Sequence, residues 1–109
     1  MKQFHTAVLE RRKAFEGAFA VQPYETPWAD EALFFLRIES RDQPRTAIRA
    51  RVQVSVDGVR WIDEGTAFPV LEGDGDHFVR VRHFGGWLRL AGETEGGGAV
   101  LTVHLVLKG

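Results

Sequence analysis

The residues best suited to metal chemistry are the carboxylates and the histidine of one glycine-rich stretch. Asp74, Asp76 and His77 lie around Gly73 and Gly75, and closely spaced oxygen ligands on a turn are what a weak calcium site needs. The distal bidentate glutamate of a full calcium-binding loop is absent at its fixed spacing. We therefore expect a solvated polar turn here, with no metal and no other cofactor.

Nucleophilic catalysis has few candidate residues in this chain. The sequence contains no cysteine, and its serines are Ser40 and Ser55. No G-x-S-x-G, phosphate-binding glycine loop or H-E-x-x-H pattern occurs. The sequence therefore predicts no catalytic residues and a protein that is not an enzyme.

Aromatic residues offer a different kind of chemistry. The tryptophans are Trp28, Trp61 and Trp87, and flat amphipathic rings of this type suit a sugar-stacking platform. Trp61 follows a turn and Trp87 follows a glycine pair, where a large ring can instead plug the end of a β-sandwich. Both interpretations stay open on the sequence alone.

These residues must be positioned by strands, because the chain from residue 45 onward consists of short apolar runs separated by turn residues. Alternation is clearest over residues 47–56, and Asp57-Gly58 predicts a two-residue hairpin that leads into a strand over residues 59–62. Further strands are expected over residues 15–21, 32–39, 66–71, 78–84, 87–90 and 99–107. Period two predicts a core that contains Val52, Val54, Leu88, Leu90, Val103 and Leu105.

The fold class that follows is all-β, a seven- or eight-stranded antiparallel β-sandwich of jelly-roll type. A chain of 109 residues is the usual size of one domain. We expect an N-terminal arm over residues 1–14, with a short helix over residues 4–13, and the sandwich over residues 15–109.

Composition narrows the range of partners. With 27% charged residues and a formal net charge of −1, the chain lacks the basic excess that attracts nucleic acid. No window approaches the roughly 20 apolar residues of a membrane helix, and residues 1–12 contain no stretch of signal-peptide length. We expect synthesis in the cytoplasm, with neither nucleic acid nor a membrane as partner.

The distribution of charge points to a protein partner. Arg49, Arg51, Arg80 and Arg82 fall within predicted strands, whereas most carboxylates lie in or near turns. Long arginines can simply cover apolar neighbours. The alternative is that they meet acidic turns of another copy. Apolar residues of the arm, in a segment too short to bury them alone, would join this contact: Phe4, Val8, Leu9 and Phe15.

Residues 54–61, Val-Ser-Val-Asp-Gly-Val-Arg-Trp, resemble the S-x-D-G-x-x-W hairpin of discoidin-like and other carbohydrate-binding jelly rolls. In overall plan the chain is also similar to small phage-type capsid decoration and tail-associated proteins. The second resemblance implies a structural protein that docks to copies of itself or to a larger surface such as a capsid-like shell, on a virion or other particle. The first implies, as the alternative, a glycan-binding module that uses Trp28, Trp61 or Trp87.

Overall fold

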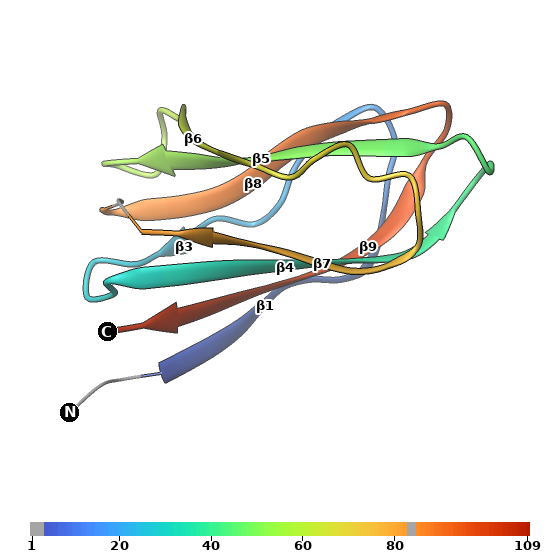
Figure 1. The fold of residues 1–109 in the computed structure, drawn as a ribbon. Coiled ribbons are helices and arrows are strands. Elements are labelled where there is room, and N and C mark those ends of the chain that lie inside the picture. The colour runs from blue at the N-terminus through green and yellow to red at the C-terminus, as the bar shows by residue number, and fades with distance from the viewer. Residues whose placement is uncertain (1–3, 83–84) are drawn as a thin grey trace.

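The computed structural model describes residues 4–82 and 85–109, and these residues form nine β-strands (Figure 1). Within this part of the chain there is no helix long and apolar enough to span a membrane. The strands are β1 (Phe4–Phe15), β2 (Ala18–Ala20), β3 (Tyr24–Glu25), β4 (Glu31–Arg41), β5 (Ala47–Ser55), β6 (Ile62–Ala67), β7 (Gly75–Val81), β8 (Trp87–Glu95) and β9 (Ala99–Lys108).

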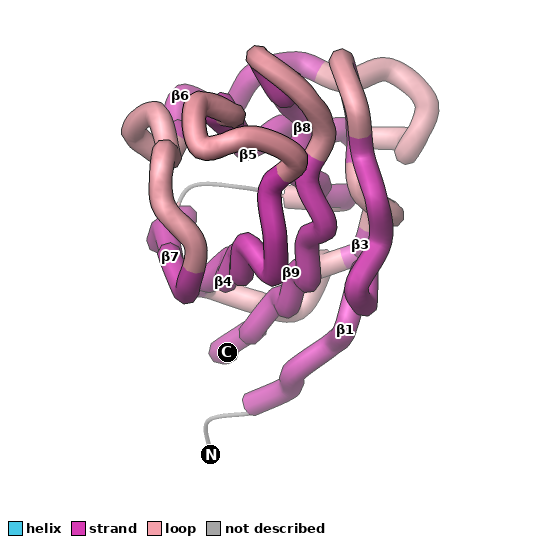
Figure 2. The backbone as a smooth tube through the Cα atoms, turned by 90° about the vertical axis from the view of Figure 1, so that its right-hand side faces the viewer, coloured by secondary structure: helices cyan, strands magenta, loops and turns pink. Residues whose placement is uncertain are grey.

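The strands form two antiparallel sheets that pack face to face (Figure 2). One sheet has the order β1-β9-β4-β7, and the other has the order β2-β8-β5-β6, with β3 also paired to β8. The predicted antiparallel β-sandwich is confirmed. The strands that were not expected are β1, where a helix was predicted, and the short strand β3, which pairs with β8. Part of the predicted strand over residues 78–84 lies outside the described residues.

The core lies between the sheets and follows the alternation in the sequence. Of the predicted core residues, Val52, Leu88, Leu90, Val103 and Leu105 are fully buried. Val54, the sixth predicted core residue, lies next to the end of β5 and is only partly buried. The alternation identified the core because side chains on a strand point to opposite faces of the sheet.

The N-terminal segment is a strand, so the predicted helix over residues 4–13 is wrong. β1 pairs with β9 along its length, and the boundary expected after residue 14 falls inside it. The register shifts between Val8 and Glu10 and again between Glu10 and Lys13, and Arg12 has a φ of 47°. Each bulge places one extra residue against the partner strand. The period of two is lost there, and the spacing imitates that of a helix.

The connection after β5 is longer than a two-residue hairpin. β6 begins at Ile62, so residues 59–61 belong to a loop rather than to the predicted returning strand. The Asp57 carboxylate accepts hydrogen bonds from the backbone N–H groups of Val59 and Arg60, at 2.8 and 3.0 Å, and these bonds hold the chain in a wider turn. Gly58 has the predicted positive φ, 79°.

We predict that Leu90→Ala lowers the free energy of unfolding by about 2–5 kcal/mol, because it leaves a cavity between two well-packed sheets. The matched control is Ile62→Ala, since Ile62 is 68% exposed and should change stability by less than about 0.5 kcal/mol. Urea denaturation measures both. Similar losses for the two variants would contradict the assignment of the core.

Gly58 and Gly17 provide a second matched pair, since their φ angles are 79° and 78°. A Cβ added at Gly58 would lie 3.1 Å from the Trp87 ring, whereas one at Gly17 meets nothing within 4 Å. We expect each alanine substitution to cost about 1–2 kcal/mol for the left-handed backbone, and Gly58→Ala to cost more. Equal losses in urea denaturation would show that Trp87 does not constrain the turn.

Candidate functional site

A row of largely apolar side chains crosses the outer face of the four-stranded sheet. The register places Val8 opposite His104, His104 opposite Phe35, and Phe35 opposite Phe78. Val8, Phe35 and Phe78 are exposed, and the side chain with the largest exposed fraction among them is Phe78, at 55%. The rings of Phe35 and Phe78 stack at 5.6 Å between centroids. All four strands therefore contribute to one continuous row, which we call the aromatic row.

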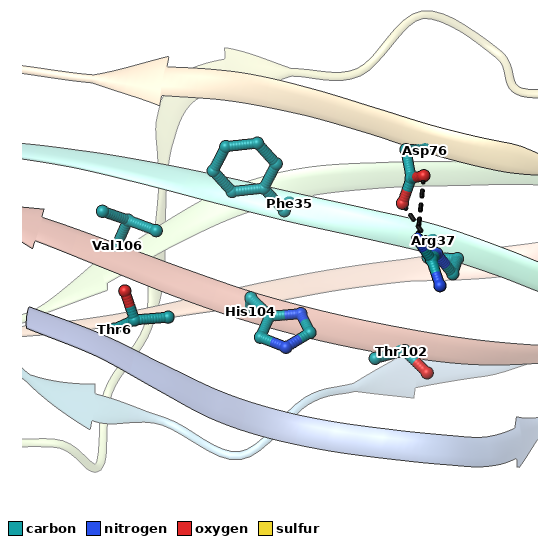
Figure 3. Close-up of a pocket in the computed structure, with 7 residues that line it drawn as sticks. All are labelled: Thr6, Phe35, Arg37, Asp76, Thr102, His104 and Val106. Atoms are coloured by element: carbon teal, nitrogen blue, oxygen red, sulfur yellow. Dashed lines mark hydrogen bonds and ion pairs between the residues drawn. The ribbon is translucent and has the colours of Figure 1, made fainter.

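A depression of about 330 Å³ lies beside the aromatic row on the same face. Figure 3 shows its lining side chains, apolar at one end and polar at the other. They come from each strand of the sheet: Thr6, Phe35, Arg37, Asp76, Thr102, His104 and Val106. The shape and lining suit an apolar group with a polar neighbour.

The polar end of the depression is an ion pair between neighbouring strands. Arg37 Nε and Nη2 donate to the two carboxylate oxygens of Asp76, at 2.8 and 3.1 Å. The hydrogen bond from Arg37 lowers the pKa of Asp76 below its usual value, and the same contact raises the pKa of Arg37. Asp76 is thus held as a carboxylate at the rim, with its side chain 63% exposed.

The arginines predicted to bind a partner are divided between the two sheets. Arg49 pairs with Glu95 at 2.9 Å, and Arg51 pairs with Asp63 at 3.2 Å and with Glu93 at 3.4 Å, all on the five-stranded sheet.

The other two predicted arginines belong to the four-stranded sheet and the loop after it. Arg80 and Arg82 approach the Glu31 carboxylate at 3.8 and 4.0 Å, together with Lys108. All four arginines therefore meet carboxylates of their own chain. They do not form one basic surface.

The apolar residues predicted to bind a partner also separate. Phe4 and Val8 are exposed, and the regular pairing over residues 4–8 puts them on the outer face with Thr6. Leu9 is buried in the core because the alternation of residues 4–8 turns it inward, and Phe15 packs partly buried against the core. Only the first two are available to a partner.

None of the tryptophans is a core residue, so the interpretation of these rings as buried plugs is wrong. Trp28 is exposed, whereas Trp61 and Trp87 are half-buried. Arg89 lies over the Trp61 ring, 4.4 Å from its centroid. The three rings belong to three different segments of the chain.

The residues considered for calcium are also held apart. Asp74 pairs with Arg41 at 2.8 Å, and Asp76 pairs with Arg37. His77 lies opposite Leu36, whose side chain faces the core. Over residues 4–82 and 85–109, no group of histidine and carboxylate side chains is placed to hold a metal ion.

Comparison with known proteins finds a similar fold but identifies no family for this chain. No protein-family model matches the sequence, and no curated protein matches it. The structure is similar to that of YomS, an SPBc2 prophage-derived protein, with a TM-score of 0.64 and 8% identity over 100% of this chain and 96% of that one. A second solved structure, FLHE, aligns with a TM-score of 0.37 and 13% identity, over 99% of this chain and 95% of that one.

We predict that Arg37→Met raises the pKa of Asp76 toward the usual aspartate value, because the charged hydrogen bonds to the carboxylate are lost. Since the pair lowers the pKa in the folded state, its contribution to stability is present at neutral pH. That contribution is lost as the pH falls through the lowered pKa. Carboxyl-detected NMR titration measures the change, with Arg49→Met as the control. An unchanged titration of Asp76 would contradict the assigned cause.

Proposed function

We propose that this chain is a non-enzymatic structural protein that docks to copies of itself or to a larger protein surface such as a capsid-like shell. The outer face of the four-stranded sheet provides the docking surface. The observation that carries this proposal is the aromatic row, which spans all four strands of that face. In this proposal a virion or other particle surface is where the protein acts after synthesis in the cytoplasm.

Exposed aromatic side chains are the main support. Phe35 and Phe78 stack on each other in the open, and Val8 is exposed on the same face. Leu33 and Val106 lie beside them but are buried. Aromatic residues are enriched at protein interfaces and often dominate their energetics. A contiguous apolar area on a sheet face is costly in water unless a partner covers it.

The ion pairs favour the apolar face over the arginines as the source of binding energy. Arg49 and Arg51 are paired with carboxylates of their own sheet, so they have little unbalanced charge to offer. Arg80 and Arg82 share the Glu31 carboxylate with Lys108, so a positive excess stays at that corner only. Exposed ion pairs contribute little to affinity in any case. We therefore assign the contact to apolar burial, which salt screens much less than it screens exposed charges.

The fold similarity to a prophage-derived protein supports the same proposal. The alignment covers this chain from end to end, so the whole sandwich is shared rather than one hairpin. Because a fold can serve many functions, this support is secondary to the surface itself.

A carbohydrate-binding module is the second candidate function. The exposure of Trp28 and the partial exposure of Trp61 and Trp87 favour it. Against it, Arg89 covers one face of the Trp61 ring, and the Trp87 ring is held against Gly58. Trp28 alone would then have to supply the stacking.

We predict a concentration-dependent mass above that of the monomer, measured by size-exclusion chromatography with light scattering. Phe78→Thr should weaken this association about tenfold or more, because it removes an exposed anchor of the aromatic row. Val70→Thr is the control, since Val70 is exposed outside that face. A monomer under every condition, together with binding to a glycan array, would replace this proposal with the carbohydrate-binding one.

A further inference from the structure

A second apolar surface lies at the end of the sandwich, in the connection from β5 to β6. Val56, Val59 and Ile62 are 92%, 77% and 68% exposed, among the largest values for apolar residues in the chain. We call residues 56–62 the apolar loop. Three branched aliphatic side chains that point into water within seven residues are unusual for a loop, where polar residues are the norm.

The apolar loop is held by hydrogen bonds. The Ser55 hydroxyl accepts from the backbone N–H of Gly58 at 2.8 Å and donates to the Asp57 carboxylate at 3.0 Å. That carboxylate accepts two further backbone N–H groups of the loop, and these bonds lower the pKa of Asp57. These bonds fix the backbone of the loop around residues 57–60, which reduces the entropy lost on binding.

The same chain contains a depression suited to such side chains. The depression beside the aromatic row is apolar over most of its lining and has a volume of about 330 Å³. It lies on the outer face of the four-stranded sheet, whereas the apolar loop connects two strands of the other sheet (Figure 2). Because the sandwich lies between them, a loop can enter this depression only from another molecule.

Polar groups also lie beside both apolar surfaces. Arg60 is exposed at the centre of the apolar loop and forms no ion pair within residues 4–82 and 85–109. Asp76 at the rim of the depression is already paired with Arg37, but its carboxylate is largely exposed and can accept a further hydrogen bond. The match between the two surfaces therefore rests on apolar burial, with Arg60 and Asp76 as polar neighbours at its edge.

We infer that the apolar loop of one copy inserts into the depression on the four-stranded sheet of the next copy. This inference rests on the proposed function and specifies its partner as a second copy of this chain. The contact joins two different surfaces, so a pair of molecules keeps one free loop on one copy and one free depression on the other. Contacts of this kind produce rings or filaments rather than closed two-fold dimers.

The test is complementation between two variants in analytical ultracentrifugation. Val56→Ser with Val59→Ser removes aliphatic side chains of the loop at positions that are exposed and free of core contacts. Thr6→Arg obstructs the depression from an exposed position on edge strand β1, and Phe35→Thr removes part of its lining as an independent second variant. Val70→Ser is the matched control, and circular dichroism verifies that each variant is folded.

We expect each variant alone to associate at least tenfold more weakly than the wild type. An equimolar mixture of the loop variant with either depression variant should give a one-to-one dimer that grows no further, because one intact loop and one intact depression remain. Val70→Ser should assemble like the wild type.

Two results would overturn the inference while the proposed docking function stands. One is a loop variant that assembles as well as the wild type, which would mean that the sheet faces stack on each other. The other is a mixture without the one-to-one dimer although each variant alone has lost association. A wild-type protein that stays monomeric would overturn both the inference and self-docking.

Discussion

The pairing of β4 with β9 is the interaction on which the rest of the structure depends. These strands lie at the centre of the four-stranded sheet, and their register runs from Glu31 opposite Lys108 to Arg41 opposite Ala99. The inward side chains of both strands are fully buried, and long β pairing between distant segments is formed only against a large loop-closure entropy. Once this register is formed, β1 pairs with β9 on one side and β7 pairs with β4 on the other. The register of these pairs then fixes which side chains lie next to each other on the outer face.

The two outer faces of the sandwich then differ in the apolar area that they expose. On the five-stranded sheet, β5 carries outward arginines and β8 carries outward glutamates. Arg49 forms an ion pair with Glu95, and Arg51 forms one with Glu93, across the two strands. On the four-stranded sheet, the outward positions of β4, β7 and β9 mix polar side chains with apolar ones, and Phe35 and Phe78 are exposed among them. One face is therefore adapted to water. The other exposes apolar area that a partner would cover, which is why the proposed contact belongs there.

Sequence could predict what depends on neighbouring residues and could not predict what depends on register. Alternation over β5, β8 and β9 gave the core, and the Asp57-Gly58 pair gave the positive φ, because both are local properties. The two bulges of β1 interrupt the alternation after Val8. The sequence therefore predicts a helical arm for this segment, and Leu9 is assigned to a partner contact instead of the core. The aromatic row joins four strands whose order is not sequential. The only local signal for it was that β4 and β9 carry apolar residues on both faces.

The free edge of β1 also limits how copies of this chain can meet. A regular exposed edge strand would accept another strand by backbone pairing and lead to aggregation. Here β1 is interrupted by two register shifts, and its exposed Arg11, Arg12 and Lys13 place three successive cations there. Bulges and cationic side chains are recognised ways of blocking an edge. The proposed association would therefore use the apolar side chains of the sheet face and the β5–β6 loop instead of this edge.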